Sequence, residues 1–260
     1  MPGALTAIGD PAVRAAFREW LLRLADDELI IGHRHSEWTG VGPDIESDVA
    51  MSSIAQEELG HGRAFYEQIA QDEGLDVDRL AFGRAPHDYR HASLVEQPNG
   101  GWEETIVRLT LYEAFETLRL GLLAQSGQQP VADLARLLVR EERYHALFAE
   151  TWLTRLARGA AGGPGRVQAA LDAAWPDALG LFEGTDADDV LLHAGVIGTS
   201  PDAQRAAWLE VVRPTLEGCG LRVPSGRARE GGRRGVHTAA FERLHAEMTE
   251  VWRSDPEARW

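Results

Sequence analysis

Apolar residues recur at intervals of three and four along most of the chain, and few helix-breaking residues interrupt them. An amphipathic helix produces this spacing, because about 3.6 residues per turn bring such positions to one face. The pattern predicts four long helices, at about residues 10–38, 44–72, 101–125 and 131–158. The strict alternation that is typical of strands is scarce. We therefore expect an all-α protein.

Breaking residues set the ends of these helices. Asp44 is the expected N-cap of the second helix, because a short acidic side chain can accept from free backbone N–H groups there. The fourth helix follows Gln129-Pro130 and must end near Arg158, before the glycine-rich run at residues 162–165. Between the second and third helices, residues 74–100 are expected to be irregular.

Shorter helices are predicted after the glycine-rich run, at about residues 166–182, 201–217 and 237–252. The run could be an interdomain linker, but the tail is too short to build a core of its own. We therefore expect residues 1–260 to form a single domain. Its bundle core covers about residues 10–158, and a helical C-terminal extension covers about residues 166–252.

Composition narrows the class of protein. The chain has a formal net charge of −15, which argues against a nucleic-acid partner because phosphates would be repelled. No stretch reaches the roughly 20 apolar residues that a membrane span needs. Residues 1–20 contain no uninterrupted apolar run, and Cys219 is the only cysteine. We expect a cytoplasmic protein without a signal peptide, a disulfide or a membrane partner.

Two helices carry a glutamate followed three positions later by a histidine. The pairs are Glu58 with His61 in the second helix and Glu142 with His145 in the fourth. Positions i and i+3 share a helix face, so each pair can reach one point in the core of a bundle. Two such pairs make up most of a di-iron or di-manganese carboxylate site, which also takes one glutamate from each remaining helix.

The remaining helices carry those glutamates. Glu28 lies 30 positions before Glu58, and Glu113 lies 29 positions before Glu142. Corresponding residues of the two halves are 84 or 85 positions apart, as expected for a duplicated antiparallel helix pair. The predicted metal ligands are Glu28, Glu58, His61, Glu113, Glu142 and His145.

The predicted ligands are expected to be buried, so the negative charges of their carboxylates must be balanced. A carboxylate in an apolar stripe costs several kcal/mol unless it is neutralised, and four of them converge here. Two metal ions would neutralise them, and oxygen with imidazole ligands suits iron or manganese. An alternative is an ancestral site whose ligands persist although no metal is used.

Neighbouring residues receive other roles. Glu57 and Glu141 point to another face and are expected to support the ligands or to lie on the surface. Glu116 and Thr117 are expected to make one side of the Glu113 helix wetter. His35 shares the face of Glu28 and could support a ligand, but we favour a packing role. A third Glu-x-x-His pair, Glu242 with His245, has no glutamate 28 to 31 positions upstream, and we interpret it as an ordinary solvated pair.

Several short strings resemble one family. They are LADDEL at residues 24–29, SEWTG at 36–40, IAQ at 54–56, LVEQPNG at 94–100 and GGRRGVHT at 231–238. They resemble PaaC-type subunits of the phenylacetyl-CoA ring 1,2-epoxidase, which belong to the ferritin-like superfamily. The resemblance covers nearly the whole chain, and the loop and tail strings are more specific than any Glu-x-x-His pair.

This resemblance implies a ferritin-like four-helix bundle inside a heteromeric, cytoplasmic monooxygenase of aerobic phenylacetate breakdown. An A-type subunit would carry the working di-iron centre, and a separate reductase with flavin and iron–sulfur groups would deliver electrons from NADPH. The complex would epoxidise the ring of phenylacetyl-CoA, and the C-type subunit would be its structural partner. The complete ligand set departs from the eroded metal site that the resemblance implies. The alternative function is a self-sufficient ferritin-like di-iron or di-manganese oxidase or metal-handling protein.

The segment of residues 222–234 is locally basic, with five arginines and one glutamate. One interpretation is a docking site for the phosphates of the aromatic acyl-CoA or for an acidic partner surface. The other is a glycine-rich surface loop that arginine keeps soluble.

Overall fold

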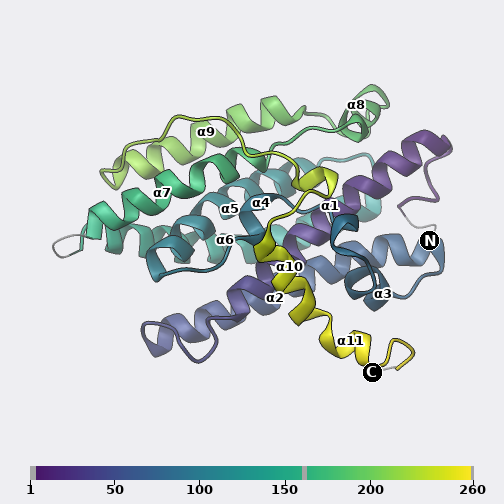
Figure 1. The fold of residues 1–260 in the computed structure, drawn as a ribbon. Coiled ribbons are helices and arrows are strands. Elements are labelled where there is room, and N and C mark those ends of the chain that lie inside the picture. Colours follow the sequence, from purple (N-terminus) through teal and green to yellow (C-terminus); the bar gives the residue numbers. More distant parts are fainter. Residues whose placement is uncertain (1–3, 160–162, 259–260) are drawn as a thin grey trace.

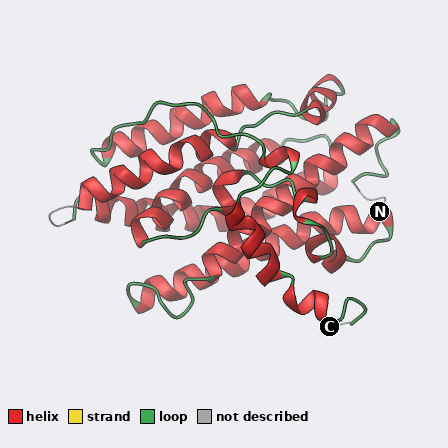
Figure 2. Ribbon diagram, in the orientation of Figure 1, coloured by secondary structure: helices red, strands yellow, loops and turns green. Residues whose placement is uncertain are grey.

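Four long helices form the centre of the molecule. The computed structural model describes residues 4–159 and 163–258, and within them the chain is helix and loop without strands (Figure 2). The long helices are α1 (Pro11–Ser36), α2 (Ile45–Glu73), α5 (Trp102–Leu123) and α6 (Gln129–Ala157). The expected all-α class is confirmed, and each of these four long helices differs from its predicted range by three residues or fewer at either end.

The caps explain where these helices begin and end. The Asp44 carboxylate accepts a hydrogen bond from Ser47 N, as predicted, and α2 ends at Gly74 with a φ of 64°. Pro130 lies in the first turn of α6, where a missing N–H costs nothing, so α6 begins at Gln129 rather than after the proline.

The long helices form two pairs, α1 with α2 and α5 with α6 (Figure 1). Gly62 lets the first pair approach closely beside the predicted ligands. A Cβ at Gly62 would lie 3.1 Å from Ala25 O and from Leu29 N, both on α1. Glu28, which directly precedes Leu29, lies at the same contact, with its Cβ 3.4 Å from that position.

The extension consists of α7 (Gly163–Gly180), α8 (Asp186–His193), α9 (Pro201–Gly218), α10 (Ala239–Met248) and α11 (Glu250–Ser254). α7 and α9 pack on α5, and α8 packs on α1. α7 begins at Gly163, so most of the glycine-rich run forms its first turn, and Gly162 lies outside the described residues. α8 was not predicted, and the helix expected at residues 237–252 is divided at Thr249.

The segment expected to be irregular contains short helices, so that expectation is wrong in part. They are α3 (Val77–Phe82), the 3-10 turn η1 (Pro86–Asp88) and α4 (Ser93–Glu96). Asp76 caps α3 by accepting from Asp78 N and Arg79 N. Helices this short give too few periodic positions to stand out in a sequence. No helix among the described residues has the length and apolar character needed to cross a bilayer.

Candidate metal centre

The six predicted ligands converge in the interior between α1, α2, α5 and α6. They are buried with 0–2% of their surface exposed: Glu28, Glu58, His61, Glu113, Glu142 and His145. α1 and α5 contribute one glutamate each, and α2 and α6 contribute one glutamate and one histidine each. The structure therefore places the complete set in one region.

The set divides into two triads, which we call position one and position two. Position one consists of Glu28, His61 and Glu142, and position two consists of Glu58, Glu113 and His145. Within each triad, one potential ligand atom per residue lies within 4.8 Å of the others. The glutamate of each i, i+3 pair thus joins the histidine of the opposite helix.

Glu142 lies between the two positions. Its Oε1 is 3.1 Å from His61 Nδ1, and its Oε2 is 3.6 Å from His145 Nδ1. Burial opposes the ionisation of Glu142, but the two imidazoles beside its oxygens outweigh burial and lower the pKa of Glu142. One oxygen of Glu142 therefore lies near the histidine of each triad, and this carboxylate would help to hold metal ions at the centre.

Two outer glutamates orient the imidazoles. His61 Nε2 is 2.7 Å from Glu141 Oε2, and His145 Nε2 is 2.7 Å from Glu57 Oε2. If each Nε2 donates its proton outward, each Nδ1 lone pair faces the centre, as in many metal sites. The side chains of Glu57 and Glu141 are 41% and 44% exposed. They therefore support the predicted ligands from the surface of the α2–α6 face.

His35 makes a polar contact that differs from the packing role expected for it. Its Nδ1 lies 2.8 Å from Glu58 Oε2 and 2.9 Å from Glu58 Oε1. Burial, together with the charges of Arg108 and His145, lowers the pKa of His35 well below its usual range. A neutral His35 can donate one hydrogen bond to Glu58 and so hold that carboxylate in place.

Glu28 is held by two residues of α5 that the sequence did not single out. Tyr112 Oη donates to Glu28 Oε1 at 2.6 Å, and Arg119 Nη2 donates to the same oxygen at 3.1 Å. Arg119 also pairs with Glu116 and with Asp27. Glu116 is fully buried while Thr117 is exposed, so only Thr117 is on the wetter side expected for this helix.

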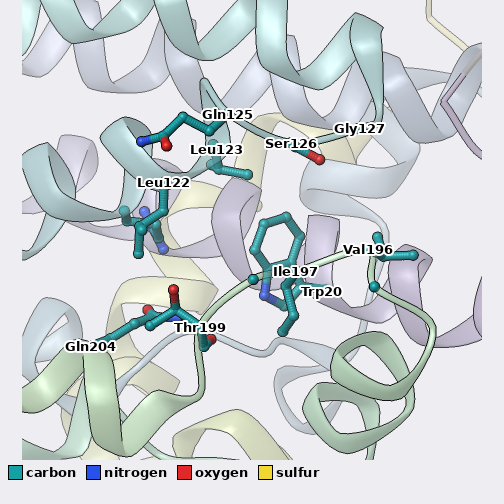
Figure 3. Close-up of a pocket in the computed structure, with 13 residues that line it drawn as sticks. Trp20, Leu122, Leu123, Gln125, Ser126, Gly127, Val196, Ile197, Thr199 and Gln204 are labelled. Atoms are coloured by element: carbon teal, nitrogen blue, oxygen red, sulfur yellow. Dashed lines mark hydrogen bonds between the residues drawn. The ribbon is translucent and has the colours of Figure 1, made fainter.

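Arg119 is also reached from a surface hollow of about 340 Å³ beside Trp20. Figure 3 shows the Trp20 indole with the loop of residues 196–199 passing beside it and Gln125 on the α5–α6 connection. Because Arg119 already bonds to Asp27 and Glu28, its guanidinium separates this hollow from the carboxylates of position one.

The basic segment at residues 222–234 is folded onto acidic residues of the same chain. Arg233 is 4% exposed, and its Nη1 lies 2.8 and 2.9 Å from the two oxygens of Asp27. Arg229 pairs with Asp177 at 2.9 Å. Neither a docking site nor a solvated loop describes Arg233, because its charge is buried and neutralised within the chain.

Electrostatics favours a cation at the centre. Burial and the neighbouring charges of Glu28 and Glu142 raise the pKa of Glu58 well above its usual range. Burial and Glu142 do the same to the pKa of Glu113. Burial alone would lower the pKa of His61, but the nearby carboxylates of Glu142 and Glu28 outweigh burial and raise that pKa to about 12. The carboxylates therefore need protons, protonated imidazoles or metal ions.

The polar atoms that lack a partner fit two metal ions. Within the described residues, those at the centre are Glu28 Oε2, His61 Nδ1, Glu113 Oε1 and Oε2, Glu142 Oε1 and His145 Nδ1. Buried polar atoms rarely remain without a hydrogen bond. Each triad offers two carboxylates and one imidazole, the hard oxygen and nitrogen donors that iron and manganese accept.

A third histidine–glutamate group does not have this character. The rings of His91 and His237 are stacked, with centroids 4.0 Å apart and an angle of 16°, and one nitrogen of each ring is already engaged by Oε2 of Glu96. Glu96 accepts from His91 Nε2 at 2.8 Å, His237 Nδ1 at 2.9 Å and Thr238 N at 2.8 Å. These bonds fasten the tail to α4.

The pair of Glu242 and His245 also stays apart from the centre. Glu242 is exposed, while His245 is half-buried with its Nε2 2.9 Å from Arg84 O.

The chain is similar to proteins of one described family. Residues 7–260 match the family described as phenylacetic acid catabolic protein. The chain is 33% identical over 243 residues to the C-type subunit of 1,2-phenylacetyl-CoA epoxidase from Escherichia coli (strain K12). That alignment covers 93% of this chain and 98% of the Escherichia coli protein.

A solved structure shares the fold. It is described as protein 19 with aldehyde deformylating oxidase activity from Synechococcus, and the TM-score is 0.62 at 18% identity. The match covers 82% of this chain and 94% of that one, and at this identity it concerns the fold alone. The expected ferritin-like bundle is thereby confirmed. From the family match and the near full-length relative, the chain belongs to the phenylacetic acid catabolic protein family.

Proposed function

We propose that this protein is the C-type subunit of a phenylacetyl-CoA 1,2-epoxidase, a multicomponent monooxygenase of aerobic phenylacetate breakdown. The observation that carries the proposal is the alignment with the corresponding Escherichia coli protein, because it spans 98% of that relative and leaves almost none of it unaccounted for. A shared fold alone would not support a function, since ferritin-like bundles host several chemistries.

The proposed partners are an A-type catalytic subunit and a reductase that carries flavin and iron–sulfur groups. The name of the Escherichia coli relative supports a heteromeric assembly, because it denotes one subunit of an enzyme. In this assembly the chain serves mainly as the structural partner, and the aromatic acyl-CoA is the substrate of the complex.

The proposed metal centre is a di-iron or di-manganese site in this subunit. Glu28, His61 and Glu142 would hold one ion, and Glu58, Glu113 and His145 would hold the other. Iron ions bound there could supply redox chemistry with dioxygen. Neighbouring residues orient several of the predicted ligands. His35 holds Glu58, and Tyr112 holds Glu28. Glu141 and Glu57 hold the imidazoles of His61 and His145.

Reconstitution separates the structural role from a catalytic one. Epoxidation of phenylacetyl-CoA by the A-type subunit and reductase should require this chain. A Glu113→Gln/Glu142→Gln variant should restore that activity if the chain is a scaffold, whereas a catalytic metal centre would make the variant inactive. Epoxidation without the chain, or failure to associate with the A-type subunit, would contradict the proposed function.

The self-sufficient oxidase remains less well supported. It would need the six ligands but no full-length match to a subunit of a larger enzyme. Fe(II)-dependent consumption of dioxygen by this chain alone, without a partner, would favour it.

A further inference from the structure

We infer that a cavity between α5, α6 and α9 binds an uncharged, ring-sized apolar molecule beside position two and not beside position one. The cavity has a volume of about 360 Å³. Its occupant is recognised by shape and by apolar contact.

The walls of the cavity are built from small side chains. Ala114 lies on α5, and Ala146 and Ala149 lie on α6, while Val211 and Val212 of α9 close the opposite side. The cavity extends from Val211, which is 54% exposed, to Glu113, which is 1% exposed. A volume of this size lies in the range of about 300–1,000 Å³ that is common for small-molecule sites.

Glu113 connects this cavity to position two. Neither of its carboxylate oxygens has a hydrogen-bond partner among the described residues, and His145 Nδ1 is 3.8 Å away. A buried carboxylate without a donor is rarely left so, because its desolvation is costly. Glu113 therefore has free coordination capacity, and it belongs both to position two and to the lining of the cavity.

Access to position one is blocked by the buried guanidinium of Arg119. One oxygen of Glu28 is taken by Tyr112 and Arg119, and Arg119 also bonds to Asp27. A guanidinium held by several bonds in the interior is a fixed obstacle. The two positions are thus unequal in access although their triads are alike in composition.

The lining also determines the chemistry of the occupant. The ionisable side chains at the cavity are Glu113 and Glu150, and neither can offer a positive charge to a free carboxylate or phosphate. No arginine of the described chain lines it. A cavity of about 150 Å³ is enough for benzene, so this one accommodates a single aromatic ring with a short substituent.

The claim that a ring binds depends only on the cavity. The claim that the bound ring lies beside a metal ion depends also on the proposed di-metal centre. The test therefore uses bromobenzene as the probe and measures the two claims separately. Crystals of the full chain are soaked in bromobenzene, and the bromine is located by anomalous scattering. Binding is also measured in solution by calorimetry.

The matched variants are Ala149→Leu, which fills the cavity, and Ala207→Leu, which adds the same atoms on the exposed face of α9. Ala146→Leu serves as a second filling variant from the half-buried edge. We expect a bromine peak between α5, α6 and α9 in the unmodified protein. Filling should weaken binding roughly tenfold or more, and Ala207→Leu should not change it.

A missing bromine peak, or binding that both filling variants leave unchanged, would overturn the inference. The link to position two is read from the visible spectrum of the Co(II)-loaded protein, which bromobenzene should perturb in the unmodified chain and not in Ala149→Leu. An unperturbed Co(II) spectrum with bound bromobenzene would overturn the claim that the ring lies beside position two. Failure to bind Co(II) would instead contradict the metal centre and leave ring binding to be judged by the bromine peak.

Discussion

Glu113 is buried, lies near other carboxylates and lines the cavity between α5, α6 and α9. Its carboxylate is fully buried, has no hydrogen-bond donor among the described residues and lies near three other carboxylates. These surroundings raise its pKa, so in the metal-free protein its ionisation opposes folding. The cost grows as the pH rises above about 4.5, because the unfolded chain ionises there and the folded chain resists.

Replacing Glu113 by glutamine, its neutral isostere, should separate the cost of burying the carboxylate from its role in metal binding. We expect Glu113→Gln to keep or increase the stability of the metal-free protein at pH 7 and to remove most of the stabilisation by Fe(II) or Mn(II). Thermal unfolding with and without each metal measures both effects. Glu150→Gln, an exposed change on α6, is the control and should alter neither. A Glu113→Gln protein with unchanged metal stabilisation would exclude Glu113 as a ligand.

Glu96 gives a pH dependence at a distance from the proposed metal centre. Burial opposes its ionisation, but hydrogen bonds from His237 and His91 outweigh burial and lower the pKa of Glu96 to about 2. The stabilisation is therefore present above the unfolded value near 4.5 and is lost as the pH falls from there to about 2.

The corresponding prediction concerns acid denaturation. Glu96→Gln should lower the free energy of unfolding at pH 7 by on the order of 2 kcal/mol. The gap to the unmodified protein should close as the pH falls toward 2. Urea unfolding at a series of pH values measures it, and a gap that does not change with pH would refute the role of the Glu96 charge.

At the scale of helices, the α1–α2 contact positions the predicted ligands. Gly62→Ala should push the two helices apart, because the new methyl would meet Ala25 O and Leu29 N at 3.1 Å. We expect a loss of stability of about 1–3 kcal/mol, together with weaker metal binding. Urea unfolding and metal titration check this.

Gly60 provides the matched control on the same helix. A Cβ there has no neighbour within 4 Å, so Gly60→Ala should stabilise α2 by about 0.5–1 kcal/mol. Equal effects of the two substitutions would show that helix propensity, and not the contact with α1, controls this region.

The tail is attached to the bundle by a buried ion pair. Arg233→Met would leave Asp27 with Arg119 as its remaining cation, and we expect a cost of about 3–5 kcal/mol. Arg222→Met, which removes an exposed pair with Asp172, should cost less than about 1 kcal/mol. Urea unfolding distinguishes them, and similar losses would contradict the anchoring role of Arg233.

The difference between predicted and observed elements has a physical basis. The long helices repeat their apolar spacing over several turns, so their pattern is clear in the sequence. α3, α4 and α8 have eight residues or fewer, and their patterns cannot be separated from loops. Their positions depend on contacts with α1 and α2 that sequence spacing does not contain.

The candidate site also contains residues that the sequence predicted and contacts that it did not predict. The six predicted ligands follow helical spacing and the offset between the two halves, so sequence was sufficient to group them. The contact of Arg119 with Glu28 joins residues 91 positions apart, and that of Arg233 with Asp27 joins residues 206 apart. No periodicity links such positions. His35 shares a helix face with Glu28, but only the structure places it against Glu58.

The whole molecule has the internal repetition that a duplicated helix pair would produce. Glu57 of α2 supports His145 of α6, and Glu141 of α6 supports His61 of α2. The surroundings break this symmetry, because Arg119 closes position one while the cavity reaches position two. A chain proposed as a structural partner thus has two candidate metal positions of different access.

The most direct test of the proposed metal centre is the location and number of metal ions in the protein. Crystals of the chain, loaded anaerobically with Fe(II) and in parallel with Mn(II), are measured at the absorption edge of each metal. The account predicts two anomalous peaks between α1, α2, α5 and α6, one in each triad, for at least one of the two metals. Absence of both peaks in protein that remains folded would contradict it.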